Sequence, residues 1–243
     1  MSLKEEQEGR IFRSCHLRQA QKCSIVNDDN QYGFLCAVPK FPKEGIKSNW
    51  EQNIDTLDVD SLFYYAIQEK LSNNQKKAAD LLRLSIKRGN LNAYCELGVM
   101  YALGDYDELN LKTAYSLWSV GSLLGNAFCK CNLAIMYKCG LHLEKDTDRA
   151  LSLLKSATNS GCYKANRHIG DILYKRGQVE AAKESYMRAS EYGCKHSSFA
   201  IAHIYQDSYN DIQNALIFYE LAREQGYPEL DNTIEELKTT LSF

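Results

Sequence analysis

Proline is scarce in this sequence of 243 residues. Its three prolines are Pro39, Pro42 and Pro228, so none lies between residues 43 and 227. Because proline lacks a backbone N–H group and clashes with the preceding helical turn, so long a proline-free stretch favours α-helices. The chain also lacks any run of 18 consecutive apolar residues. This absence predicts that no helix is inserted into a membrane.

An excess of charge of either sign is also missing. Lys and Arg total 29 and Asp and Glu total 31, which gives a net charge of -2. A protein that binds nucleic acid concentrates basic residues on one surface, so the balance predicts no nucleic-acid partner. Helical repeats that read RNA have units of similar length, and retention on heparin at physiological salt would favour that class. The charged start MSLKEEQEGRIFRS has no apolar segment typical of a secretory signal peptide.

Nine cysteines are an odd number for a protein stapled by disulfides. We interpret them as reduced thiols, mostly buried, in a cytoplasmic and reducing compartment. Cys129 and Cys131 are two residues apart and point in different directions on a helix, which makes a shared zinc ion unfavourable. The N-terminal group lacks a paired C-x-x-C element and consists of Cys15, His16, Cys23 and Cys36. The sequence therefore predicts no metal and no cofactor.

Familiar catalytic motifs are absent as well. The chain contains no G-x-S-x-G, no G-x-x-x-x-G-K-[ST], no H-E-x-x-H and no G-x-G-x-x-G. A non-catalytic protein is the expectation. The minor alternative is a cysteine-dependent enzyme that pairs Cys131 with His168, although no activating group is evident beside them.

What the sequence does contain is a repeat. A small residue lies inside an apolar run at spacings of 32 to 36 residues, at Ala66, Gly98, Ala134, Gly170 and Ala202. A glycine closes each unit, at Gly89, Gly125, Gly161, Gly193 and Gly226. An alanine precedes each closing glycine by eleven residues, at Ala78, Ala114, Ala150, Ala182 and Ala215. Three landmarks in register five times indicate five copies of one structural unit.

Each unit is predicted to form two helices. In the third unit Ala150, Leu153, Leu154 and Ala157 recur at the three- and four-residue spacing of an amphipathic helix. A single helical hairpin cannot bury its apolar face, so the units must stack. We predict five hairpins over 57–227, with units 57–90, 91–126, 127–162, 163–194 and 195–227. Residues 228–243 form a capping helix, and residues 1–56 form an N-terminal cap with a short helix, a hairpin and a linker at 38–47.

These landmarks resemble the Sel-one-like repeat (SLR) family, a relative of the tetratricopeptide repeat (TPR). Unit two matches its pattern at Ala93, Leu97, Gly98, Tyr101 and Gly104. The later matches are Leu133, Tyr137, Gly140, Leu143, Asp146, Ala150, Ala157 and Gly161 in unit three, and Ala165, Ile169, Gly170, Ala182, Ala189 and Gly193 in unit four. The resemblance implies an all-α, right-handed α-solenoid that acts as an adaptor or scaffold for another protein.

In such solenoids the first helix of each hairpin lines the concave face. By analogy with TPR proteins, the residues expected to bind a partner there are Phe63, Tyr64, Glu96, Phe128, Asn132, Lys138, Lys164, Arg167, His168, Asp171, Tyr174, Lys175, Phe199 and His203. Two plainer explanations stay open: the charges lie on a solvated helix face, and the aromatic residues belong to the core. The aromatic residues would otherwise serve as anchors for the partner.

Unit four places several cationic or titratable groups together, which favours an acidic or C-terminal peptide. Some TPR adaptors hold a peptide carboxylate with an asparagine from one repeat and a lysine and an arginine from the next. Asn132 and Lys164 match those positions, and His168 stands where the arginine is expected. Cys95 and Val99 stand where the other lysine and asparagine are expected, so half of the clamp is missing.

The tail NTIEELKTTLSF suggests a second role. Its paired glutamates, hydroxyl residues and terminal Phe243 resemble C-terminal signals of type IV secretion substrates. The alternative is therefore a bacterial effector that engages a host protein in the host cytosol. An amphipathic cap helix explains the same residues. The sequence does not indicate the oligomeric state or the identity of the partner.

Overall fold

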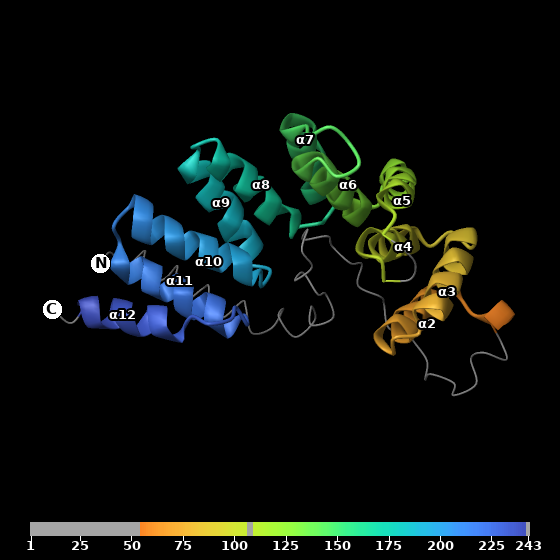
Figure 1. The fold of residues 1–243 in the computed structure, drawn as a ribbon, viewed down its shortest axis with the longest axis horizontal. Helices are drawn as coiled ribbons and strands as arrows, with labels where there is room; N and C mark the ends of the chain where they lie inside the picture. The colour runs from red at the N-terminus through yellow and green to blue at the C-terminus, as the bar shows by residue number, and fades with distance from the viewer. Residues whose placement is uncertain (1–53, 106–108, 242–243) are drawn as a thin grey trace. The chain divides into compact units, whose positions relative to one another are not determined.

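The computed structural model describes residues 54–105 and 109–241, and every regular element among them is helical (Figure 1). These residues form eleven α-helices, one π-helical turn and a 3₁₀ turn at 54–56, with no strand. The predicted all-α fold of paired helices is confirmed. The short helix, hairpin and linker expected near the N-terminus lie outside the described residues.

The helices divide between two compact units, which are described separately. We call the described residues up to Cys162 unit A and residues 163–241 unit B. Unit A contains α2 (Val59–Leu71), α3 (Gln75–Lys87), α4 (Leu91–Leu103), α5 (Leu111–Leu123), α6 (Ala127–Cys139) and α7 (Thr147–Asn159). Unit B contains α8 (Ala165–Lys175), α9 (Val179–Ser190), α10 (Lys195–His203), the π-helical turn η3 (Ile204–Ser208), α11 (Ile212–Glu224) and α12 (Asp231–Leu241).

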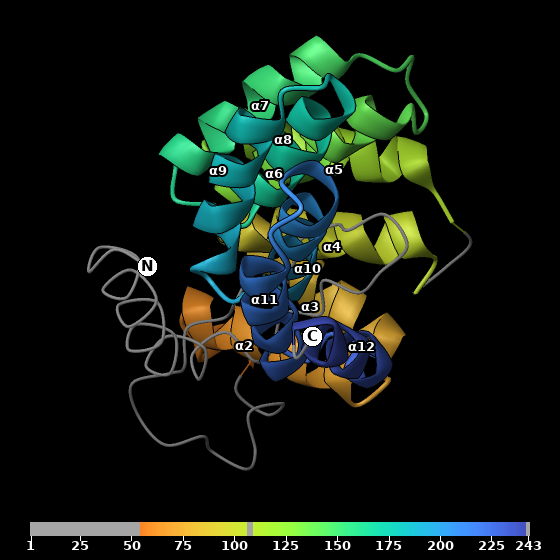
Figure 2. The same cartoon turned by 90° about the vertical axis from the view of Figure 1, so that its left-hand side faces the viewer.

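Within each unit, helices that follow one another in the chain pack together. In unit A, α2 packs on α3, α4 on α5 and α6 on α7, and α4 also contacts α6 across the hairpins. In unit B, α8 packs on α9 and α10 on α11, while α10, α11 and α12 lie side by side in both views (Figure 1 and Figure 2). Each unit is therefore a stack of helical hairpins.

The ends of the helices follow from local sequence. Asn126 begins α6, and its side-chain oxygen accepts a hydrogen bond of 2.9 Å from the backbone N–H of Cys129. Asp146 does the same at α7, where Arg149 N–H donates over 2.8 Å. Such caps satisfy backbone donors that the first helical turn leaves without a partner. The five closing glycines all have positive φ angles, from 79° to 94°, which allows the chain to leave the second helix of each hairpin.

The small residue of the first helix sets how closely its hairpin packs. A Cβ atom added to Gly98 in α4 would lie 2.3 Å from Nε1 of Trp118 in α5. Trp118 is fully buried and donates a 3.1 Å hydrogen bond to the carbonyl oxygen of Cys95. Gly170 in α8 has the same role, since an added Cβ would lie 2.6 Å from the ring of Tyr186. In both hairpins a large ring occupies the space that the missing side chain leaves.

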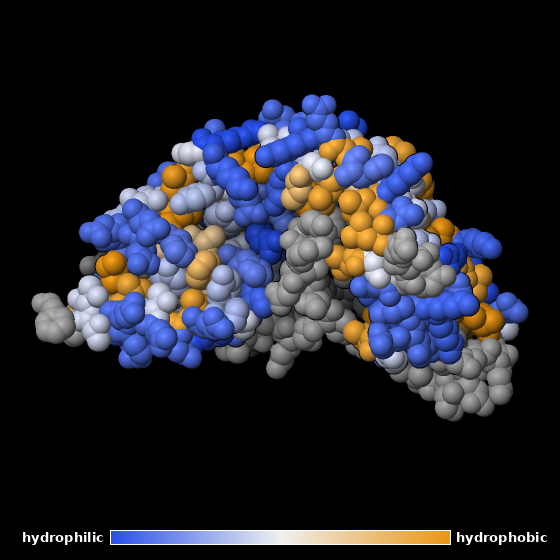
Figure 3. Space-filling model, viewed as in Figure 1, coloured by the Kyte–Doolittle hydropathy of each residue, from blue (hydrophilic) through white to orange (hydrophobic). Residues whose placement is uncertain are grey.

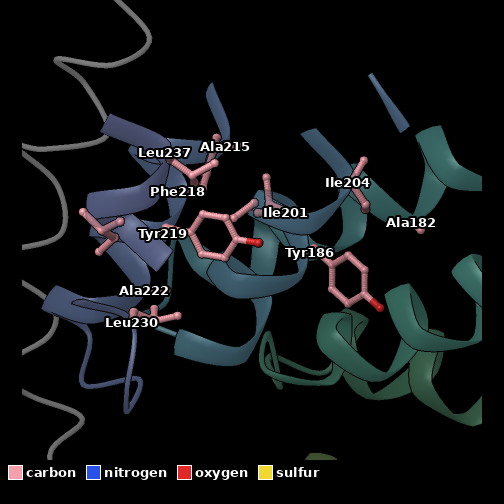
Figure 4. Packing of buried hydrophobic residues seen from close by; sticks show 12 residues of the cluster. Ala182, Tyr186, Ile201, Ile204, Ala215, Phe218, Tyr219, Ala222, Leu230 and Leu237 are labelled. Carbon is pink, nitrogen blue, oxygen red and sulfur yellow. The ribbon is translucent and has the colours of Figure 1, made fainter. Parts of the chain in front are cut away.

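The core cluster of unit B gathers buried residues of α9, α10, α11 and α12. Figure 4 shows Ile201 and Tyr219 within this cluster of buried residues. Ile234 and Leu237 of α12 are buried in the same cluster, so α12 covers the apolar side of the preceding hairpin. Among the helices of the described residues, none is both long and apolar enough to cross a membrane.

We expect Gly98→Ala to lower the free energy of unfolding by about 1–3 kcal/mol, because the new methyl group would overlap Trp118. Urea unfolding followed by circular dichroism measures this effect. Trp118→Leu removes the obstructing ring, so Gly98→Ala should cost clearly less in that background. Equal costs in the two backgrounds would show that the close approach is not the cause.

Candidate functional site

The predicted binding residues fall into three groups by exposure. The buried side chains are Phe63, Tyr64, Glu96, Asn132 and His168. The half-buried ones are Phe128, Lys138, Lys164, Arg167, Asp171 and Phe199. The exposed ones are Tyr174, Lys175 and His203. The first group lies in the interior of its unit, and the other two groups present side-chain atoms to solvent.

The buried group has a common physical reason. In α2 every residue from Ser61 to Ile67 is buried, and in α6 every residue from Cys131 to Tyr137 is buried. Seven consecutive residues cover all sides of a helix, so these first helices are enclosed over that stretch. The analogy with TPR proteins assumes an open face, and this stretch of both helices has none.

In unit A the buried polar side chains bind one another. Glu96 accepts a 3.1 Å hydrogen bond from Nζ of Lys70, and only 2% of the Glu96 side chain is exposed. Asn132 is fully buried and donates from Nδ2 to Sγ of Cys95, 3.4 Å away. Both residues therefore have structural partners in the neighbouring first helix.

In unit B, His168 and Asp171 of α8 belong to a network with Tyr186 of α9. Nδ1 of His168 lies 3.6 Å from Oδ2 of Asp171, and the Tyr186 hydroxyl donates a 3.0 Å hydrogen bond to Oδ1. Burial and the adjacent Asp171 carboxylate raise the pKa of Tyr186 well above its usual range. The phenol thus keeps its proton and holds Asp171 in place beside the buried imidazole.

The cations of α8 have a different environment. Lys164 precedes the helix and Arg167 lies in its first turn, and both are half-buried. Lys175 ends the helix and is exposed, as is the neighbouring Tyr174. Asp171 accepts from Tyr186 and its side chain is 32% exposed, so the surface of α8 carries cationic side chains, an aromatic ring and one carboxylate.

A second group of side chains surrounds Phe199 in α10. The rings of Phe199 and Tyr227 stack with centroids 4.3 Å apart, and His203 meets Phe199 edge to face at 4.6 Å. His203 is exposed and its Nδ1 lies 3.4 Å from Oδ2 of Asp207. Tyr219 contacts both Phe199 and His203 from α11. We call Phe199, His203, Tyr219 and Tyr227 the α10 aromatic cluster.

Sequence reasoning selected Phe199 and His203 but missed Tyr219 and Tyr227. Tyr227 follows the closing glycine, where no helical register predicts the direction of a side chain. Tyr219 lies on the second helix, which the analogy with TPR proteins assigns to the opposite face. Its hydroxyl donates a 2.8 Å hydrogen bond to Gln206 in the π-helical turn.

Five of the six cysteines among the described residues are inaccessible. Cys95, Cys129, Cys131, Cys162 and Cys194 are buried thiols, and Cys139 is exposed. Cys131 and His168, the pair of the enzyme hypothesis, are both buried, and a buried thiol in apolar surroundings reacts poorly. Within residues 54–105 and 109–241, no group of three His, Cys, Asp or Glu side chains is arranged to hold a metal ion.

Comparison with solved structures identifies the fold as that of Sel1-type and TPR repeat proteins. The Sel1 repeat protein from Oxalobacter formigenes is 16% identical, with a TM-score of 0.64 over 73% of this chain and 77% of that one. The immunity protein Pa5087 from Pseudomonas aeruginosa is 18% identical, with a TM-score of 0.53 over 75% of this chain and 72% of that one. A thermophilic TPR protein from Thermus thermophilus is 18% identical, with a TM-score of 0.51 over 76% of this chain and 100% of that one.

No protein-family model matches the sequence, and no curated protein matches it. The likeness therefore lies in the fold. It confirms the predicted resemblance to SLR and TPR repeats.

We expect the stability of the protein to fall as the pH rises from about 10 to about 12, in part because of Tyr219. Burial and the nearby Asp207 raise the pKa of Tyr219 to about 12 in the folded state, against 10.0 for an ordinary tyrosine. Between these values the unfolded chain loses the proton and the folded chain keeps it, so ionisation favours unfolding.

Tyr219→Phe removes this titration, so its stability should fall less steeply than that of the wild type over the same pH range. Urea unfolding at several pH values measures the difference, with Tyr174→Phe as the comparison at an exposed ring. Parallel pH profiles for wild type and Tyr219→Phe would contradict the assignment.

Proposed function

We propose that this protein is a non-catalytic scaffold that binds a partner protein or peptide through the surface of α8 in unit B. The observation that carries the proposal is the grouping of Lys164, Arg167, Tyr174 and Lys175 on one short helix with solvent access. Stacked helical hairpins supply a rigid support for such a surface. The same fold serves many functions, and its surface residues decide which one. These side chains therefore support the proposal more than the fold does.

An acidic or C-terminal peptide fits this surface by charge. Lys164 and Arg167 lie at the start of α8, where the aligned peptide dipoles also favour an anion. Arginine binds a carboxylate through two parallel N–H groups, which adds geometric selectivity. Tyr186 donates to the neighbouring Asp171 as a neutral phenol and leaves its negative charge in place, so an incoming carboxylate would compete with Asp171 for these cations.

The proposed contact differs from the full clamp of TPR adaptors. Asn132 and His168 are buried with structural partners, so neither reaches a peptide at the surface. We assign carboxylate binding to Lys164 and Arg167 instead. Lys175 would contact a second acidic group further along the peptide.

Aromatic side chains near this surface would anchor apolar parts of the partner. Tyr174 is 42% exposed, and Tyr163 is 45% exposed and stacks on Tyr192 with ring centroids 4.4 Å apart. Rigid, partly exposed tyrosines are typical of residues that dominate binding energy.

We place this function in a reducing compartment, because the six described cysteines form no disulfide and five of them are buried. The role of a type IV-secreted effector stays a prediction of the sequence. Much of its proposed signal lies in α12, where Ile234 and Leu237 pack into the core and so have a structural role.

We expect Lys164→Glu/Arg167→Glu to abolish recovery of a specific partner in affinity purification from lysate. The same change should weaken binding of acidic peptides with a free C-terminal carboxylate by about tenfold or more, because two charge-assisted contacts become repulsive. Fluorescence polarisation against such peptides and their C-terminal amides measures the effect.

The matched control is Lys155→Glu/Arg188→Glu, which makes the same change in net charge at exposed positions of second helices. It should bind like the wild type. If both double variants lose the partner equally, overall charge and not the α8 surface governs binding. If neither loses it, the proposed site is wrong.

We also expect Tyr174→Ala to lower partner affinity by about tenfold, or roughly 1–2 kcal/mol, as truncation of an interface aromatic does. Its exposed position means that the melting temperature should change little. Binding assays and thermal melts on the same sample separate the two effects. An unchanged affinity would remove Tyr174 from the site.

A further inference from the structure

The start of α8 in unit B carries a pair of stacked tyrosine rings. Tyr163 lies immediately before Lys164, and Tyr192 lies two residues after the end of α9. The two rings are nearly parallel, at 4°, with centroids 4.4 Å apart, so Tyr192 covers one face of the Tyr163 ring. Tyr163 is nevertheless 45% exposed. This exposure leaves the opposite face and the edge of its ring for a ligand.

The repeat does not require this ring pair. Tyr163 lies two residues after one closing glycine, and Tyr192 lies one residue before the next. In other hairpins the same two positions hold Leu91 and Leu124, Ala127 and Ser160, and Lys195 and Gln225. Hairpins therefore close without two tyrosines. Much of the surface visible over α8 and α9 in the space-filling view is hydrophilic, which leaves few apolar anchors for a partner (Figure 3).

Tyr163 and Arg167 lie one helical turn apart on the same side of α8. Lys164 has helical backbone angles, with φ −62° and ψ −22°, and the carbonyl oxygen of Tyr163 accepts a 3.0 Å hydrogen bond from Asn166 N–H. The helical path therefore extends back to Tyr163, and residues four apart on a helix are neighbours. A residue whose carboxylate binds Arg167 is consequently within reach of the Tyr163 ring.

Charge directs an incoming carboxylate to the Tyr163 side of Arg167. On the other side, four residues further along α8, Asp171 keeps its negative charge beside the neutral Tyr186 phenol and repels an anion. At the start of the helix, Lys164 and the aligned peptide dipoles attract one. The residue that carries the carboxylate is thus brought next to the accessible face of the Tyr163 ring.

We propose that the stacked pair selects peptides whose last residue is aromatic. The ring of that residue extends the stack on Tyr163, while its carboxylate binds Arg167 and Lys164. This inference rests on the proposed function of the α8 surface and names its ligand more closely. A third ring gains an attraction between aromatic faces that an aliphatic side chain does not provide. Tyr192 is a positioning residue, because it holds the Tyr163 ring and does not itself contact the peptide.

The test is fluorescence polarisation of the full chain with acidic peptides that differ only in their last residue, which is phenylalanine, leucine or alanine. The wild type should bind the phenylalanine peptide about three- to tenfold more tightly than the leucine peptide, and the alanine peptide least tightly. Tyr163→Leu removes the ring and should bind the first two peptides about equally. Tyr163→Phe keeps the ring and should keep the preference. The C-terminal amides should bind weakly to every variant, because they lack the carboxylate.

Tyr174→Leu is the matched control, because Tyr174 is also an exposed tyrosine of α8 but lies beyond Asp171. Whatever its overall affinity, it should keep the preference for phenylalanine, and thermal melts check that every variant is folded. Carboxylate-dependent binding with no aromatic preference overturns the inference and leaves the proposed function standing. So does a preference that survives in Tyr163→Leu or disappears in Tyr174→Leu. If no peptide binds, or if Lys164→Glu/Arg167→Glu binds like the wild type, the proposed carboxylate site is wrong and the inference fails with it.

Discussion

The close approach of two helices at a glycine is the constraint on which the α4–α5 and α8–α9 hairpins depend. Gly98 leaves room for Trp118, and Gly170 leaves room for Tyr186, at distances that a methyl group would not permit. Because the ring fills the space, burial of a large apolar surface and a fixed helix spacing arise from one contact. The polar contacts of each ring then set its orientation: Trp118 donates to the Cys95 carbonyl oxygen and Tyr186 to Asp171.

The same constraint determines which residues are available for binding. Tyr186 packs against Gly170 and also holds Asp171, and Asp171 lies beside the buried His168. Asp171 and His168, which the sequence predicts to bind a partner, therefore belong to the structural network of their hairpin. The cations Lys164 and Lys175 lie at the two ends of α8 and keep side-chain atoms at the surface, which supports the proposed partner contacts there.

Departures from the repeat are as informative as the repeat. Tyr163 and Tyr192 stack at positions that other hairpins fill without a ring pair, so the packing of the repeat does not require them. The π-helical turn after α10 is a departure in backbone geometry, and it brings Gln206 to the hydroxyl of Tyr219. Both features lie at hairpin ends or loops, where the repeat specifies least.

The sequence by itself determined the helical class, the pairing of helices and the small residue inside each first helix, because these follow from local periodicity and from landmarks repeated five times. It also identified the cationic character of α8. Only the tertiary structure decided which faces are open. The analogy with TPR proteins places Asn132 and Phe63 on an open face. In the structure, every residue in the surrounding stretches of α6 and α2 is buried. Tyr227 joins the α10 aromatic cluster from the loop after Gly226. The helical period of the sequence does not predict the path of a loop. Local spacing predicted the buried face of a second helix such as α7, but the enclosure of the first helices on their remaining sides depends on contacts with neighbouring hairpins.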